Sequence, residues 1–255
     1  GAAFDEPRYV AAARRAADFA LSHLRDAEGR LFKRWRLGEA AFGGTLEDYA
    51  FLSWGLLELY EASFEPRDLA AALELTQSMR AHFADAERGG FFTAPDDGEE
   101  LLFRHKEVYD GALPSGNSVA AWNLLRLARL TGRAELEEDA RRTLSAFGSA
   151  ARMPSAHTLY LLALDCALGP SFEVVIAGDP AAADTRAMLR AFQARFAPNL
   201  VLLLRPPGET PAIAELAPFT LDQESRGGKA TAYVCRNYAC RAPTTDVAQA
   251  LANLD

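Results

Sequence analysis

The amino-acid sequence predicts a mainly α-helical protein, built of α/α helical hairpins and followed by a small α/β lobe. Two observations lead to this fold class. Apolar residues recur at three- and four-residue spacing from about residue 7 to residue 169, which is typical of amphipathic helices. After Ser171, short apolar runs alternate with one helical segment, which is typical of α/β structure. We therefore expect two domains, residues 1–169 and 170–255.

The first region contains six segments with helical periodicity. In the second segment, Tyr49, Leu52 and Leu56 recur on one face, and Thr45 with Asp48 resembles an N-terminal capping box. The expected helices are Pro7–Leu24, Thr45–Ala62, Arg67–Ala84, Gly116–Leu130, Ala134–Phe147 and Ser155–Leu168.

The second region reads as a β-α-β unit with a third strand. Strands are expected over Phe172–Ala177 and Asn199–Leu204, and a helix over Ala181–Phe196 connects them, so the two strands should be parallel. A third strand over Ala230–Cys235 and a closing helix over Thr245–Leu254 complete the lobe.

The helical region contains an internal repeat of helical hairpins. The segment that starts at Trp54 is similar to the one that starts at Trp122, 68 residues later. Short connections alternate with two long ones, Asp26–Gly44 and Asp85–Ser115, so the long ones should lie at one end of the stack. Long loops without secondary structure are usually functional, which makes this end the candidate site.

Composition excludes several classes of protein. The 255 residues carry 27 basic and 35 acidic side chains, a net charge of −8, so we expect no nucleic-acid partner. The apolar runs are far shorter than the roughly 20 residues that span a bilayer, and the first residues do not resemble a signal peptide. Three cysteines argue against a disulfide framework. A cytoplasmic protein without membrane contact is expected.

Three motifs resemble one known family. Phe42–Phe51, Lys106–Ser118 and Tyr233–Cys240 are together similar to the spermatogenesis-associated thioredoxin-domain family. The resemblance implies a toroid of the six-hairpin glycosidase and N-acylglucosamine 2-epimerase type, with a thioredoxin-like domain elsewhere in the chain. Six helices make three hairpins, so the resemblance implies half of an (α/α)6 toroid here. It also implies the family's thioredoxin-like domain as a partner.

Polar residues at the long-loop end form a candidate site for a polyhydroxylated ligand. Carboxylates, hydroxyls and aromatic rings around a concave mouth suit a carbohydrate. Hydrolysis needs two carboxylates, and epimerisation needs an acid and a base. The candidate catalytic residues are Asp48, Lys106, Glu107 and Asp110, and the candidate substrate-binding residues are Trp35, Arg36, Tyr49, Tyr109 and Asn117.

Each candidate also has a structural interpretation, so two functions stay open. The protein is either a carbohydrate-directed epimerase, isomerase or glycosidase, or a non-catalytic binding or scaffold domain. Convergence of Asp48 with the Lys106–Asp110 segment in one pocket would favour the enzyme, whereas well-paired ions would favour the scaffold. Three hairpins leave an apolar flank, which self-association, a partner chain or the C-terminal lobe could cover.

The cysteines and histidines point to neither a metal nor a cofactor. Cys235 and Cys240 lack the two further ligands of a zinc site, and we expect packing thiols there, with a redox pair as the alternative. Cys166 lies on an apolar helix and is expected in the core.

Overall fold

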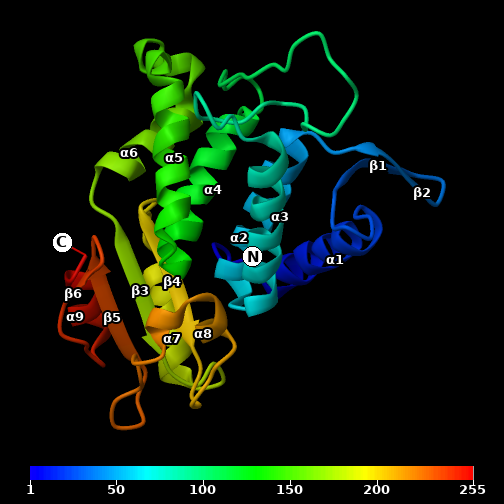
Figure 1. The fold of residues 1–255 in the computed structure, drawn as a ribbon. Coiled ribbons are helices and arrows are strands. Elements are labelled where there is room, and N and C mark those ends of the chain that lie inside the picture. The colour runs from blue at the N-terminus through cyan, green and yellow to red at the C-terminus, as the bar shows by residue number, and fades with distance from the viewer. Residues whose placement is uncertain (255) are drawn as a thin grey trace.

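The computed structural model describes residues 1–254 and shows a mainly helical chain with small sheets (Figure 1). The six predicted helices of the first region are all present, with ends shifted by a few residues. The α-helices are α1 (Pro7–His23), α2 (Leu46–Ser63), α3 (Pro66–Phe83), α4 (Gly116–Thr131), α5 (Ala134–Ala146), α6 (Thr158–Leu168), α7 (Ala183–Gln193), α8 (Ile213–Leu216) and α9 (Val247–Ala252). Short 3-10 turns are η1 (Gly148–Arg152), η2 (Pro154–Ala156) and η3 (Pro218–Thr220).

Helix α4 lies at the centre of the helical stack. It packs against α2 on one side, α6 on the other and α5 behind, and α2 packs in turn against α1 and α3. Every residue of α4 is buried, including the polar Asn123 and the charged Arg126 and Arg129. Helices α2, α4 and α6 therefore form one layer, with α3 and α5 on its outer side. The half-toroid implied by the family resemblance stays a prediction.

A β-hairpin occupies the first long connection, where we expected no secondary structure. Strands β1 (Phe32–Arg36) and β2 (Glu39–Gly43) are antiparallel, and Leu37 and Gly38 join them with φ of 54° and 87°. Positive φ at both central residues defines the type I′ turn that suits a two-residue hairpin. The second long connection, between α3 and α4, has no strand of its own among its residues and lies at the top of Figure 1.

The C-terminal sheet has the strand order β4-β3-β5-β6, and its bounds are β3 (Phe172–Ala177), β4 (Leu200–Arg205), β5 (Thr231–Arg236) and β6 (Ala239–Cys240). Strands β3 and β4 are parallel, as the β-α-β pattern predicts, while β5 runs antiparallel to β3. The short edge strand β6 was not expected.

The sheet is buried on both faces because helices cover each of them. Val175 and Leu203 belong to the apolar core of the helical stack, whereas Val174 and Leu202 pack with α7 and α9. Alternate residues of a strand point to opposite faces, so all six residues of β3 are buried. The C-terminal lobe thus covers one side of α4. The division into domains at residues 169 and 170 stays a prediction.

Among residues 1–254, none of the helices combines the length and the apolarity that crossing a lipid bilayer requires.

Candidate functional site

The first turns of α2 and α4 meet at the long-loop end of the stack. A Cβ atom at Gly116 would lie 2.8 Å from Leu46 Cγ and 3.1 Å from Glu47 Oε1, so only glycine allows this approach. The backbone N–H of Leu46 also donates to the Thr93 carbonyl of the long α3–α4 connection. The helices α2 and α4 therefore begin at the same end of the helical stack, as the alternation of short and long connections predicts.

Asp48 contacts the start of its own helix. Its Oδ2 accepts hydrogen bonds from the Thr45 backbone N–H at 2.7 Å and from the Thr45 hydroxyl at 2.9 Å. This contact is one half of the capping box that the sequence indicates. The contacts found for the Asp48 side chain hold the entry of α2, and its convergence with Lys106, Glu107 or Asp110 in one pocket stays a prediction.

Lys106 forms an ion pair within the long α3–α4 connection. Its ammonium lies 2.6 Å from Asp85 Oδ2 and donates to the Gly89 carbonyl at 2.9 Å. The hydrogen bond from Lys106 lowers the pKa of the Asp85 carboxyl. The neighbouring Glu107 carboxylate is half-exposed and lies 3.6 Å from His105. Lys106 thus fastens two ends of one connection together.

Asp110 is a buried carboxylate that joins the starts of α4 and α6. Its Oδ1 accepts the Ser115 backbone N–H at 2.9 Å, and its Oδ2 accepts the N–H groups of Leu159 at 2.8 Å and Tyr160 at 2.9 Å. Only 5% of the residue is exposed. The first N–H groups of a helix have no partner within the helix, so Asp110 satisfies donors of α6 that would otherwise be buried unpaired.

Asn117 and Tyr49 are buried and bind backbone groups of the two long connections. The Asn117 amide accepts from the Phe91 N–H at 2.8 Å and donates to the Phe91 and Glu107 carbonyls, each at 2.9 Å. The Tyr49 hydroxyl accepts the Leu31 N–H at 2.8 Å. Both side chains thus fix the connections to the inner helices.

The remaining candidates lie farther out on the surface. Trp35 packs edge-on against Phe19 and His23 of α1, and Arg36 is exposed at the end of β1. Tyr109 is 61% exposed, and its ring meets His157 edge-on with 6.5 Å between centroids. Of the aromatic candidates, Tyr109 offers the most open ring.

The sequence did not indicate an ion cluster between α2 and α4, in which a buried Arg126 pairs with two more exposed carboxylates. The Arg126 guanidinium lies 2.7 Å from Glu58 Oε1 and 3.0 Å from Glu61 Oε2. Burial raises the pKa of Glu61, although the Arg126 charge opposes that shift, and the two carboxylates keep Arg126 charged by raising its pKa. The repeat could have indicated this pair, since Glu58 and Arg126 each follow a matched tryptophan by four residues.

Three potential metal ligands lie together at the end of α3. The ligand atoms of His82, Asp96 and Asp97 lie within 4.8 Å of one another. The Arg30 guanidinium binds both Asp97 oxygens, and its positive charge opposes a cation at that place.

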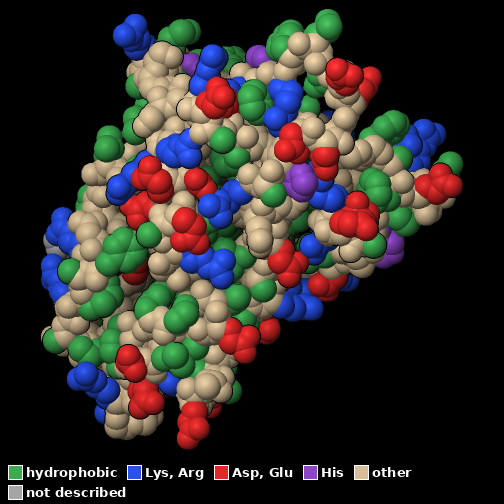
Figure 2. Space-filling view, in the orientation of Figure 1, with side chains coloured by type: hydrophobic (Ala, Val, Ile, Leu, Met, Phe, Trp, Pro, Cys, Tyr) green, Lys and Arg blue, Asp and Glu red, His purple; other side chains and the backbone are tan. Residues whose placement is uncertain are grey.

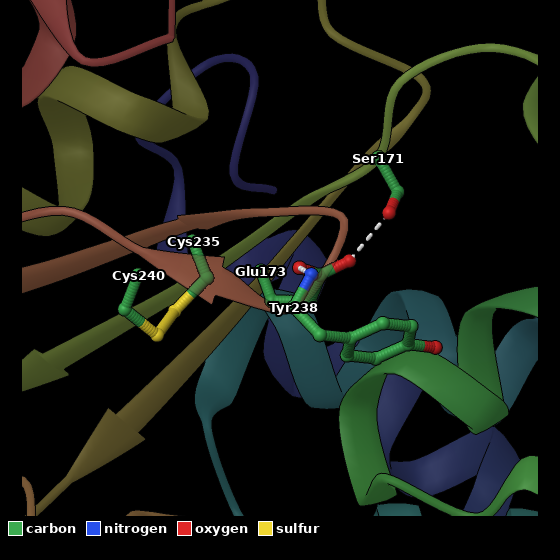
Figure 3. Close-up of a disulfide and its surroundings, with 5 residues drawn as sticks. All are labelled: Ser171, Glu173, Cys235, Tyr238 and Cys240. Carbon is green, nitrogen blue, oxygen red and sulfur yellow. Dashed lines mark hydrogen bonds between the residues drawn. A yellow bond between two sulfur atoms is a disulfide. The ribbon is translucent and has the colours of Figure 1, made fainter.

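The two C-terminal cysteines form a disulfide, which corrects the expectation of packing thiols. Cys235 and Cys240 face each other across β5 and β6, and their sulfur atoms are bonded (Figure 3). Asn237 and Tyr238 form the two-residue turn between the strands, with φ of 50° and 64°. That turn brings the cysteines opposite each other, a geometry that the spacing alone did not reveal. Cys166 is free and buried, as expected.

Fold and site together describe a helical-hairpin protein with a C-terminal α/β sheet, whose candidate polar groups bind mostly its own backbone and side chains. No family model matches the chain. The chain is 36% identical over 260 residues to spermatogenesis-associated protein 20 of Homo sapiens. The aligned region covers 96% of this chain and 33% of the human protein. The Mus musculus protein of the same name is 36% identical over 259 residues. An uncharacterized Caenorhabditis elegans protein is 28% identical over 255 residues.

These similarities are consistent with the family that the motifs resemble. The chain spans about one third of the length of the curated relatives it matches.

Proposed function

We propose that this chain is a non-catalytic scaffold or binding domain of a longer protein. The observation that carries the proposal is the pairing of the candidate catalytic groups at the long-loop end. Asp48 binds Thr45, Lys106 binds Asp85, and Asp110 accepts three backbone N–H groups. A catalytic acid or base must keep an atom free to reach the substrate, whereas these groups hold helices and connections in place.

The same end carries an apolar surface suited to a partner. Figure 2 shows hydrophobic side chains on the protruding connection at the top, while acidic and basic groups are mixed over the rest of this face. Large exposed apolar patches usually mark interaction sites. We define the long-loop surface by the exposed side chains Leu37, Phe42, Leu102, Phe103 and Leu113.

The expected occupant is another domain of the longer protein, since relatives are about three times as long as this chain. The thioredoxin-like domain that the family resemblance implies is the partner we propose. On this proposal, the helical stack presents the long-loop surface, and Tyr49 and Asn117 keep its two long connections rigid. A rigid surface loses little conformational entropy on binding.

Calorimetric titration with an isolated thioredoxin-like domain of the family tests this proposal. Serine substitution of Leu102 and Phe103 together should weaken binding at least about tenfold, because large apolar anchors dominate such interfaces. Leu168→Ser is the matched control, since Leu168 is 80% exposed at the opposite end of α6 and should not matter. Equal binding by both variants, or no binding by the wild-type chain, would contradict the proposal.

Carbohydrate binding at the same end is the second candidate function. The exposed ring of Tyr109 beside Asp110 favours it, because sugars stack on open aromatic faces. Titration with mono- and oligosaccharides tests this candidate directly. Binding that is lost in Tyr109→Ala and kept in Tyr9→Ala, an exposed tyrosine of α1, would support a sugar site and count against a purely protein-binding surface.

A further inference from the structure

We propose that Cys235 and Cys240 form a thiol–disulfide exchange site, which accepts two electrons from an external dithiol and returns them. The inference goes beyond the proposed scaffold function and does not depend on it. It rests on the placement of the disulfide at a sheet edge, on the unequal exposure of its two sulfur-bearing residues, and on the contacts that hold the surrounding turn without it.

The disulfide lies where a partner can reach one of its sulfurs. β6 is the edge strand of the sheet and contains only two residues, and Cys240 is the exposed one of the pair. Cys235 lies on β5 and is 6% exposed. An attacking thiolate must approach one sulfur in line with the sulfur–sulfur bond, so the more accessible of the two sulfurs is the one attacked. The geometry makes Cys240 the sulfur that is attacked.

The turn between the two cysteines is fixed by contacts that survive reduction. The Asn237 N–H donates to the Ser171 carbonyl at 3.0 Å, and the Asn237 side chain accepts the Ser171 N–H at 2.9 Å. The Tyr238 N–H donates to Glu173 Oε2 at 2.9 Å. Figure 3 shows Glu173, Ser171 and Tyr238 beside the disulfide. The bond can therefore open while the hairpin keeps its position.

The disulfide also closes a very short loop, since the two cysteines are five positions apart. The entropy removed from the unfolded chain grows with loop length, so a short loop gives a small stabilisation. A bond that adds little to the fold and lies at an accessible edge is better suited to exchange than to structural support.

The exchange proceeds in two balanced steps. One thiolate of the external dithiol attacks Cys240 Sγ, the bond between the cysteines breaks, and Cys235 leaves as a thiolate that takes up a proton. The mixed disulfide now joins Cys240 to the first sulfur of the external dithiol. The second thiolate of that dithiol attacks this first sulfur, the bond to Cys240 breaks, and Cys240 leaves as a thiolate that takes up a proton. The external dithiol is oxidised to its disulfide, and the protein is reduced by two electrons.

Cys166 serves as an internal reference thiol for the test. It is buried, and its pKa is raised because burial disfavours the thiolate. A buried thiol with a raised pKa reacts slowly. Only Cys235 and Cys240 should therefore become alkylated when the folded protein is reduced.

Equilibration of the folded chain in mixtures of reduced and oxidised glutathione tests the proposal. Alkylation and mass spectrometry of each mixture should show the reduced form growing steadily with the share of reduced glutathione, while circular dichroism stays unchanged. Structural disulfides resist reduction by glutathione. A pair that stays oxidised in every mixture, or that is reduced only when the protein unfolds, would overturn the proposal.

Single substitutions test which sulfur is attacked. Cys235→Ser should form a mixed disulfide with oxidised glutathione more than about tenfold faster than Cys240→Ser, because the remaining thiol is exposed in the first variant only. Equal rates would overturn the assignment. Should either variant fail to fold, brief reaction of the wild-type protein with reduced glutathione, followed by alkylation and mass spectrometry, gives the same answer. Glutathione should be found on Cys240 and the alkyl group on Cys235, because attack on Cys240 releases Cys235.

Discussion

Replacement of Asp110 by alanine distinguishes a structural carboxylate from a catalytic one. Three backbone N–H groups, from Ser115, Leu159 and Tyr160, would lose their acceptor at a buried place. A hydrogen bond to a charged group contributes about 1.5–3 kcal/mol, and loss of a helix cap costs about 0.5–2 kcal/mol. Since the three bonds share one carboxylate and are not additive, we expect the free energy of unfolding to fall by about 3–5 kcal/mol.

Urea denaturation followed by circular dichroism measures this loss. Asp110→Asn keeps the size and one acceptor oxygen, so it should lose less than the alanine variant. Glu107→Ala is the control, because its carboxylate is half-exposed and its substitution should change stability by less than about 0.5 kcal/mol. A loss below about 1 kcal/mol for Asp110→Ala would refute the reasoning and return Asp110 to the catalytic candidates.

Four further substitutions test the packing and the charges of the helical stack and of its α3–α4 connection. Since Lys106 lowers the pKa of Asp85, their pair stabilises the fold above about pH 4 and this stabilisation is lost as the pH falls below it, so Lys106→Met should flatten the acid side of the stability profile measured in urea. Burial raises the pKa of Glu61, so the fold loses stability as the pH rises above the ordinary carboxyl pKa of about 4.3. Glu61→Gln does not titrate, so this decline should be absent from its stability profile in urea. Gly116→Ala should lower the free energy of unfolding by about 1–3 kcal/mol, because the added Cβ has no room beside Leu46. Gly55→Ala, whose Cβ would have no atom within 4 Å, should raise the free energy of unfolding by about 0.5–1 kcal/mol in the same urea denaturation.

Helices α2 to α6 could be predicted from the sequence because each buries an apolar stripe or lies wholly in the core, whereas α1 has no buried residue and is predicted by its alanine-rich sequence and its N-terminal proline. The pattern around Tyr49, Leu52 and Leu56 has helical spacing, and the β-branched run of β3 has the length of a strand. The hairpin β1–β2 was missed because its residues are largely exposed and lack such alternation. The Leu37-Gly38 turn indicates a hairpin, but a turn of this kind is weak evidence when charged residues surround it and no alternating strands flank it.

The roles of the candidate residues could not be predicted, because a helix start attracts the same residue types for capping as for catalysis. Asp48 lies in the first turn of α2, where the sequence indicates a capping box, and Asp110 lies shortly before α4. The bonds from Asp110 to the first turn of α6 are visible only in three dimensions. Lys106 finds its partner Asp85 21 positions away, across a connection whose course no periodicity describes. Its pairing therefore depended on the fold of the loop.

The repeat explains how the buried Arg126 of one inner helix finds a partner of opposite charge on the next. Glu58 and Arg126 are equivalent positions, 68 residues apart, and they meet because α2 and α4 lie side by side with their repeats at the same height. The indole of Trp54 donates to Glu58 at 3.1 Å, and the Arg126 guanidinium lies over the ring of the matched Trp122 at 5.9 Å. Because the repeated units pack in register, opposite charges at one repeat position face each other, and the charge of the buried Arg126 is compensated between the helices.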